Sequence, residues 1–344
     1  MKSKYSEYAY YLSRMTANDR TYIIPPSVEI DLTNSCNQDC TYCNVAVFRN
    51  EVRDRTKIHD YHSLIDDIAS WSSHKKNSIG NVNTVTFVGG GEPTARKGYE
   101  YVLEQAIDNN FLVSLITNGS RLEQLENISQ NSLSRISWVG VDIDSGDEEI
   151  YEQVRRSKQD GLYHKVKENI KWLTSQGINV DIKSLLFDKT ITQESIDSTL
   201  RYCKEVNARM VYFRLALIDG SIYQLSDFDH QYILDAAKKI GVKVSVNKSR
   251  MGTRTYSKCH ALHLIPVFSS DGNIYTCCEN RGNDFFKLCN WTDPSFKDVW
   301  MSEKHFNMYQ NLDLNLCKPC RPHSHNIEID NLITSKDFVS DMFF

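Results

Sequence analysis

Three cysteines within eight residues form the first group of side chains that could carry chemistry. Cys36, Cys40 and Cys43 have the spacing Cys-x3-Cys-x2-Cys and follow a strand-like run at residues 27–33. Thiolates held by one loop can bind one metal ion or one iron-sulfur cluster. Three ligands leave the fourth position of a tetrahedral ion or a cubane cluster open. The triplet therefore predicts a metal centre with one position free for chemistry.

A second possible ligand set lies near the C-terminus and consists of Cys259, Cys277, Cys317 and Cys320. Its close pair, Cys-x2-Cys, is typical of both zinc sites and iron-sulfur sites. The spacing alone leaves a structural zinc, a second cluster and coincidence open. Because the surrounding segment is short and rich in Cys, His, Asn and Asp, we expect a small domain that a metal holds together.

Glycine and polar residues follow several of the predicted strands. The run Gly89-Gly90-Gly91-Glu92-Pro93 leaves one strand, and Asn118 and Asp144 follow the next two. A residue without a Cβ atom lets the backbone approach a ligand closely. In parallel α/β folds, ligands gather at the carboxyl ends of the strands. We therefore expect these residues to share one site with the cysteine loop.

A repeating order of strand and helix must position these residues. Helices such as the amphipathic segment 163–176 separate the strands. Parallel neighbours need crossover connections, so the fold class is α/β, as an open doubly wound sheet or a partial barrel. The predicted strands are 27–33, 83–88, 112–117, 136–143, 179–187 and 210–217.

Composition excludes several classes of protein. The net charge of -4 gives no reason to expect a nucleic acid partner, and no apolar run reaches the roughly 18 residues of a membrane span. The first residues lack the order of a signal peptide, so we expect a cytoplasmic protein whose ten cysteines are metal ligands or buried thiols. The expected segments are an N-terminal extension (1–26), a core (27–250), a cysteine-rich domain (251–330) and a tail (331–344).

These motifs together resemble those of the radical S-adenosylmethionine (SAM) enzymes. In that family a Cys-x3-Cys-x2-Cys loop binds a [4Fe-4S] cluster, SAM chelates the fourth iron, and a Gly-Gly-Glu-Pro run takes up the SAM amino group. Thr117-Asn118-Gly119 resembles the family's TNG strand end. Val141-Asp142-Ile143-Asp144 is similar to its SLD strand end, although Asp142 replaces the usual serine. The resemblance covers residues 27–323 and implies a partial (β/α)6 TIM-like barrel with a small C-terminal auxiliary-cluster domain.

The resemblance also implies roles for single residues. The cysteine triplet is expected to ligate the SAM-binding cluster. Arg155 resembles the arginine that reaches the SAM carboxylate, and Arg156 is the competing assignment. Lys183 and Arg214 point off the fifth and sixth strands and are candidates to contact SAM or substrate. The expected SAM contacts are Tyr42, Gly90, Gly91, Glu92, Asn118, Asp142 and Arg155.

The C-terminal cysteines resemble a shortened SPASM pattern, the "twitch" domain, which carries one auxiliary [4Fe-4S] cluster. The resemblance implies that Cys259, Cys277, Cys317 and Cys320 hold this cluster, with zinc as the alternative. An electron donor such as flavodoxin or ferredoxin would reduce the first cluster, which cleaves SAM to a 5'-deoxyadenosyl radical that abstracts a substrate hydrogen. The auxiliary cluster could then aid oxidation or position the substrate. A thiol, with Cys289 as the candidate catalytic residue, would instead return a hydrogen atom and give epimerisation.

Two substrate classes fit this chemistry. We favour a peptide, as in the maturation of ribosomal peptide natural products, which would dock directly or through a separate peptide-recognition protein. The alternative is oxidation or epimerisation of a sugar, aminocyclitol or nucleoside-type small molecule. A zinc-binding structural or scaffold protein is an alternative of another class. It would give no reason for the glycine run and the polar strand ends.

Overall fold

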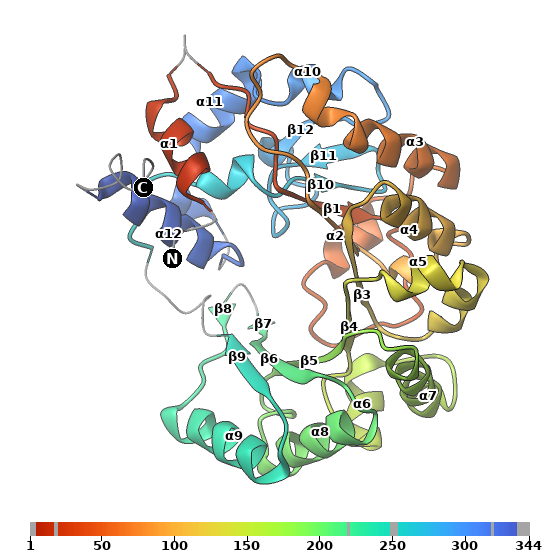
Figure 1. Ribbon diagram of the computed structural model, residues 1–344. Coiled ribbons are helices and arrows are strands. Elements are labelled where there is room, and N and C mark those ends of the chain that lie inside the picture. Colours follow the sequence, from red (N-terminus) through yellow and green to blue (C-terminus); the bar gives the residue numbers. More distant parts are fainter. Residues whose placement is uncertain (1–4, 17–19, 219–220, 248–253, 318–319, 336–344) are drawn as a thin grey trace.

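One ten-stranded sheet runs through the protein in the order β12-β11-β10-β1-β2-β3-β4-β5-β6-β9 (Figure 1). The computed structural model describes residues 5–16, 20–218, 221–247, 254–317 and 320–335. Neighbouring strands from β1 to β9 are all parallel, which confirms the α/β class. The central strands are β1 (Ser27–Asp31), β2 (Thr84–Val88), β3 (Leu112–Thr117), β4 (Trp138–Asp142), β5 (Val180–Leu186), β6 (Met210–Leu215) and β9 (Val244–Asn247).

Six of these strands lie where the sequence predicts them, and β9 is an addition. The short strand β9 pairs with β6, and its residues are only partly buried. Val244 and Val246 alternate with Ser245 and Asn247, a strand pattern of only four residues that the sequence prediction missed. A two-stranded hairpin, β7 (Leu217–Ile218) and β8 (Ser221–Ile222), follows β6.

Helices cover one face of the sheet (Figure 1). Helix α9 begins after Ser226, whose hydroxyl accepts the Asp229 backbone N–H, and ends at the left-handed Gly241. Among the described residues no helix is long and apolar enough to cross a membrane. The helices are α1 (Ser6–Arg14), α2 (Ala46–Glu51), α3 (Ile58–Ala69), α4 (Tyr99–Asp108), α5 (Gln130–Ser134), α6 (Glu148–Arg155), α7 (Leu162–Ser175), α8 (Gln193–Glu205), α9 (Asp227–Ile240), α10 (Phe296–Val299), α11 (Glu303–Asn311) and α12 (His323–Thr334).

The two faces of the sheet differ because side chains alternate along each strand. Val28 and Ile30 of β1 are fully buried in the main hydrophobic core, in register with Val85 and Phe87 of β2. The alternate positions carry polar groups, among them Glu29 of β1. One face therefore packs against helices, and the other provides the polar side chains of the site.

The C-terminal segment continues the sheet instead of standing apart from it. Strand β10 (Val267–Phe268) is parallel to β1, and β11 (Asn273–Tyr275) and β12 (Lys287–Asn290) follow it antiparallel. Helix α1 packs beside α12, where the Tyr5 hydroxyl lies 2.7 Å from Nδ1 of His325. The expected boundary between residues 250 and 251 and the end of the tail lie outside the described residues.

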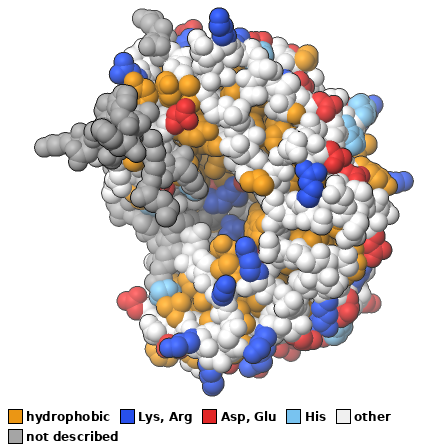
Figure 2. All heavy atoms as spheres, viewed as in Figure 1, with side chains coloured by type: hydrophobic (Ala, Val, Ile, Leu, Met, Phe, Trp, Pro, Cys, Tyr) orange, Lys and Arg blue, Asp and Glu red, His pale blue; other side chains and the backbone are white. Residues whose placement is uncertain are grey.

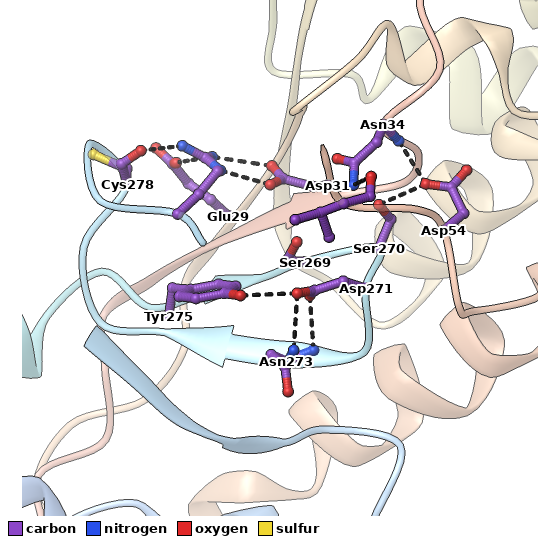
Figure 3. A network of polar contacts seen from close by, with 12 residues as sticks. Glu29, Asp31, Asn34, Asp54, Ser269, Ser270, Asp271, Asn273, Tyr275 and Cys278 are labelled. Carbon is purple, nitrogen blue, oxygen red and sulfur yellow. Dashed lines mark hydrogen bonds and ion pairs between the residues drawn. The ribbon is translucent and has the colours of Figure 1, made fainter. Parts of the chain in front are cut away.

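Buried charges on β1 join the two parts of the sheet (Figure 3). The Arg281 guanidinium donates to Asp31 at 2.6 and 3.0 Å and to Glu29 at 3.2 Å, and all three side chains are at most 8% exposed. Arg321 forms a second ion pair with Glu29. Burial opposes the charge of Glu29, yet the two arginines hold its pKa below the usual value. Burial raises the pKa of Asp31.

A second group of hydrogen bonds lies beside these ion pairs. The Asp54 carboxylate accepts from the Thr33 hydroxyl at 2.5 Å, the Asn34 backbone N–H at 2.7 Å and the Ser270 hydroxyl at 2.8 Å (Figure 3). Thr33 and Asn34 lead into the cysteine loop, and Ser270 belongs to the turn between β10 and β11. The start of the cysteine loop is thus fixed to the C-terminal segment.

Replacing Arg281 by Met should lower the free energy of unfolding by roughly 3–5 kcal/mol, because the buried Asp31 loses its partner and Glu29 loses one of its two arginines. Adding Asp31→Asn should restore part of that loss, since the amide carries no charge. Urea unfolding of the three proteins measures both effects. Arg201→Met is the control: its pair with Asp197 is 3.6 Å long and its side chain is 62% exposed, so the loss should stay below about 1 kcal/mol. Equal losses in the two single variants would contradict the assigned role of Arg281.

Candidate active site

One cavity of about 220 Å³ brings the predicted SAM and cluster residues together at the carboxyl ends of β1 to β6. Figure 2 shows a hollow in the middle of this face, with Lys and Arg side chains inside it. The sequence motifs that line the cavity lie up to 119 residues apart, between Cys36 and Arg155, so only the sheet could assemble them. The residues predicted at the site that line the cavity are Cys36, Cys40, Cys43, Tyr42, Gly90, Gly91, Glu92, Asn118, Asp142 and Arg155.

The cysteine loop is held by contacts with its backbone. The Thr41 backbone N–H donates to the Val154 carbonyl of α6 at 2.9 Å, and Arg49 donates to the Gln38 carbonyl at 3.0 Å. Burial raises the pKa of the Cys36 and Cys40 thiols, that of Cys40 to about 11. A thiol of raised pKa becomes a thiolate when a cationic metal centre binds it. The donor set, three thiols facing one cavity, therefore fits a cluster.

The glycine run packs against the cysteine loop. A Cβ atom on Gly91 would overlap the Ser35 carbonyl, and one on Gly90 would overlap the Asn34 side chain. Backbone hydrogen bonds of 2.9 Å from Gly91 to Thr33 and from Glu92 to Ser35 hold the two loops together. The sequence predicts that these glycines let a ligand approach the backbone closely. The same glycines are also needed for the two loops to pack against each other.

Glu92 is buried below the glycine run and connects β2 to the end of β3. Its carboxylate accepts the Thr117 hydroxyl at 2.5 Å, the Thr94 hydroxyl at 2.6 Å and the Asn118 backbone N–H at 2.7 Å. Burial raises the pKa of Glu92, and these hydrogen bonds oppose the rise. The Asn118 amide in turn donates to Asn37 of the cysteine loop at 2.9 Å. Both residues line the cavity and position its walls.

Arg155 reaches the cavity from the last turn of α6. Its guanidinium pairs with Asp144 at 2.9 Å and lies 3.8 Å from the Cys40 sulfur, while its Nε is buried without a partner among the described residues. Burial opposes its charge, but Asp144 and Cys40 outweigh burial and raise the pKa. Arg156 is exposed and does not line the cavity. Of the two arginines, the structure brings Arg155 to the site.

Tyr42 and Asp144 complete this side of the cavity. The Tyr42 ring packs edge-on against Phe187 with centroids 4.4 Å apart. Asp144 has a left-handed backbone, with φ of 65°, which turns its carboxylate towards Arg155 and the Leu185 backbone N–H. The sequence places Asp144 at a strand end but gives it no role. Its partner Arg155 lies on another element, so no local pattern reveals the pair.

A second cavity lies in the C-terminal segment, and Cys259, Cys277, Cys317 and Cys320 all line it. Burial raises the pKa of each thiol. Four thiols that line one cavity are a donor set that fits an iron-sulfur cluster.

The two cavities adjoin. Cys278, Glu279 and Arg321 line both of them. The sequence did not predict that these residues lie between two sites. Cys278 and Arg321 each directly follow a predicted ligand, and that position is the sequence signal by which they could have been identified. A molecule in the first cavity would lie next to the second.

Cys289 lines neither cavity. It lies on β12 opposite Ile274, and its side chain packs against the main hydrophobic core. Burial raises its thiol pKa to about 12. The expectation that Cys289 faces the substrate is therefore not met, because the β11–β12 pairing turns it towards the core. The cysteine outside the two ligand sets that does reach the first cavity is Cys278.

Comparisons with known proteins give the family. The model of the radical SAM superfamily matches residues 30–213, and the SPASM model, an iron-sulfur cluster-binding domain, matches residues 259–322. A UPF0026 protein of Methanocaldococcus jannaschii is 25% identical over 52% of this chain and 54% of its own length. A "Probable GTP 3',8-cyclase" of Methanocella arvoryzae is 27% identical over 52% and 53%. The chain thus spans about half the length of these curated relatives.

Among solved structures, Streptococcus suis SuiB bound to precursor peptide SuiA has a similar fold. The TM-score is 0.65 at 15% identity, over 93% of this chain and 75% of that one. At this identity the likeness concerns the fold. It includes both the parallel sheet and the C-terminal segment, since the coverage is nearly complete.

Replacing Gly91 by Ala should displace the cysteine loop, because the new methyl group meets the Ser35 carbonyl. We expect the purified variant to lose about four irons per chain, those of one cluster, while the other cluster remains. Iron and sulfide analysis measures this. Gly177→Ala is the matched control: it has a left-handed backbone but no atom within 4 Å of the new methyl, so it should cost about 1 kcal/mol and keep its iron. Full iron content in Gly91→Ala would refute the packing argument.

Proposed function

This chain belongs to the radical SAM superfamily and carries a SPASM iron-sulfur cluster-binding domain, and from that premise we propose that it modifies a residue of a peptide substrate. A SAM-binding [4Fe-4S] cluster and an auxiliary iron-sulfur cluster are the cofactors of these two domains. The observation that carries the proposal is the junction of the two cavities at Cys278, Glu279 and Arg321.

The residues are assigned as follows. Cys36, Cys40 and Cys43 hold the first cluster, and Cys259, Cys277, Cys317 and Cys320 hold the auxiliary one. When bound there and reduced, the first cluster and SAM would supply hydrogen-atom abstraction by a 5'-deoxyadenosyl radical. Arg155 offers its unpartnered Nε and its charge to the SAM carboxylate. The remaining SAM contacts are Tyr42, Gly90, Gly91, Glu92, Asn118 and Asp142.

The chain's own part in the reaction is to hold the reacting carbon between two centres. Positioning of this kind lowers the barrier because the reactants meet in one orientation. The buried ion pairs of Arg281 and Arg321 with Glu29 fix the wall that both cavities share. With one hydrogen atom taken up as 5'-deoxyadenosine, an auxiliary cluster held beside the first cavity could take one electron from the substrate, and one proton would leave to solvent. The net change would then be the loss of two hydrogens, an oxidation.

Two observations support a peptide over a small molecule. The cavity opens into a hollow on the surface, so a chain could pass through it without being enclosed (Figure 2). The solved structure with a similar fold holds a precursor peptide. The matched relative named as a GTP cyclase favours the alternative, a nucleotide-type small molecule.

Anaerobic reconstitution tests the two-cluster assignment. The wild-type protein should contain about eight irons per chain and form 5'-deoxyadenosine from SAM and reductant. Cys317→Ala should lose about half the iron and still cleave SAM, whereas Cys36→Ala should lose about half and cleave none. Cys203→Ala is the control, since its thiol is buried in the core between α8 and the sheet. Equal SAM cleavage by Cys36→Ala and the wild type would overturn the assignment.

The substrate class is tested with the reconstituted protein and peptides encoded next to its gene. Mass spectrometry should detect a loss of about 2 Da in the modified peptide, because oxidation removes two hydrogens. GTP serves as the small-molecule arm of the same experiment. Turnover of GTP without any change in the peptides would overturn the peptide proposal in favour of the alternative.

A further inference from the structure

Lys183 is a buried cation that faces the first cavity. It lies in the middle of β5, opposite Asp142 of β4 and Tyr212 of β6, and is 5% exposed. Gly140 of β4 leaves room for it, since a Cβ atom there would lie 2.8 Å from the Lys183 Cδ. The side chain therefore belongs to the cavity wall as a built feature of the sheet.

The ammonium group of Lys183 is poorly satisfied within the chain. Its Nζ lies 3.9 Å from an Asp142 oxygen, beyond hydrogen-bond distance, and 6.0 Å from the centre of the Trp138 ring. Within the described ranges it makes no hydrogen bond, although an ammonium has three donors. A buried charge is costly unless it is paired and hydrogen-bonded.

Charges on the neighbouring elements do not supply the missing partner. Burial lowers the pKa of Lys183 to about 7, Asp142 raises it, and Arg214 and Arg321 lower it. Glu29 on β1 also faces Lys183, but it is held by Arg321 and Arg281. Asp142 is itself assigned to SAM.

The other carboxylates around the cavity are occupied as well. Asp144 pairs with Arg155, and Glu92 accepts hydrogen bonds from Thr94, Thr117 and Asn118. Arg214 lies one strand from Lys183, on β6, and lines the same cavity. Lys183 therefore faces the cavity without a hydrogen-bonded carboxylate, and an anion from outside the chain is the partner that its ammonium group lacks.

We propose that Lys183, with Arg214 and Arg321 beside it, binds a carboxylate of the substrate, so that the peptide carries an acidic side chain close to the modified residue. This proposal rests on the proposed peptide-modifying function. Lys183 would select acidic over amide side chains of the substrate, because a neutral amide leaves the charge of the ammonium group unpaired.

The test uses the reconstituted, SAM-loaded protein, so that the SAM carboxylate site is already filled. Two fluorescein-labelled probes, acetyl-Ala-Glu-Glu-Ala-lysine and acetyl-Ala-Gln-Gln-Ala-lysine, are titrated by anisotropy under argon. We expect the Glu probe to bind at least about tenfold more tightly than the Gln probe, and Lys183→Met to remove that difference. Lys171→Met is the control, because Lys171 lies on the outer surface of α7.

Equal binding of the two probes by the wild type, or no binding up to 10 mM, overturns the proposal. So does an unchanged Glu preference in Lys183→Met, provided that the variant keeps its iron and its SAM-dependent thermal shift. Inorganic phosphate is the third arm: protection of Lys183 from acetylation by phosphate, with no binding of the Glu probe, would assign the site to a phosphate and overturn the carboxylate.

A second measurement follows the reactivity of the Lys183 amine directly. Limited acetylation followed by mass spectrometry should show Lys183 protected about threefold at a Glu-probe concentration twice its Kd, with Lys171 unchanged. Equal protection by the Gln probe overturns the proposal. Absence of 5'-deoxyadenosine formation would instead overturn the proposed function. Because that assay uses no peptide probe, failure of the proposed function can be distinguished from failure of the Lys183 proposal.

Discussion

Two buried carboxylates in the middle of the sheet constrain the whole protein. Glu29 and Asp31 lie on the polar face of β1, the strand that leads into the cysteine loop, and both depend on arginines from the C-terminal segment. A buried charge without a partner would cost several kcal/mol, so the parallel sheet and the C-terminal segment are stable only together. Arg321 directly follows Cys320 of the second ligand set. The electrostatics of β1 therefore set the distance between the two cavities.

The first site is rigid because its loops bind one another. The Gly91 backbone packs on Ser35, Glu92 binds the end of β3, and Asn118 binds Asn37 of the cysteine loop. The first two contacts join the ends of neighbouring strands, and the third reaches across β2 from the end of β3 to the loop after β1. Residues that the sequence assigns to a cofactor thus also hold the loops that would present it. A substitution in one of them changes both the ligand contact and the position of the thiols.

The chemistry depends on what lies between the two cavities. Cys278 and Arg321 reach both, while Cys289 turns into the core. An auxiliary cluster one wall away from the substrate fits removal of an electron and an oxidised product. Lys183 lines only the first cavity, where it would orient an acidic substrate beside the wall that both cavities share.

The sequence by itself determined the family and the parallel α/β class, and it predicted two ligand sets whose cysteines line the two cavities. Those features follow from local sequence patterns: the cysteine spacing, the glycine run, and the alternation that predicts the bounds of β1 to β6 to within about two residues. It missed the four-residue strand β9 and the pairing of β10 with β1, which joins positions more than 200 residues apart. It favoured Arg155, with Arg156 as the competing assignment, and it favoured Cys289. Only the tertiary structure decided these points. Packing fixes the helix turn and the strand register, and these decide which side chain faces a cavity, so two residues adjacent in sequence can face different ways.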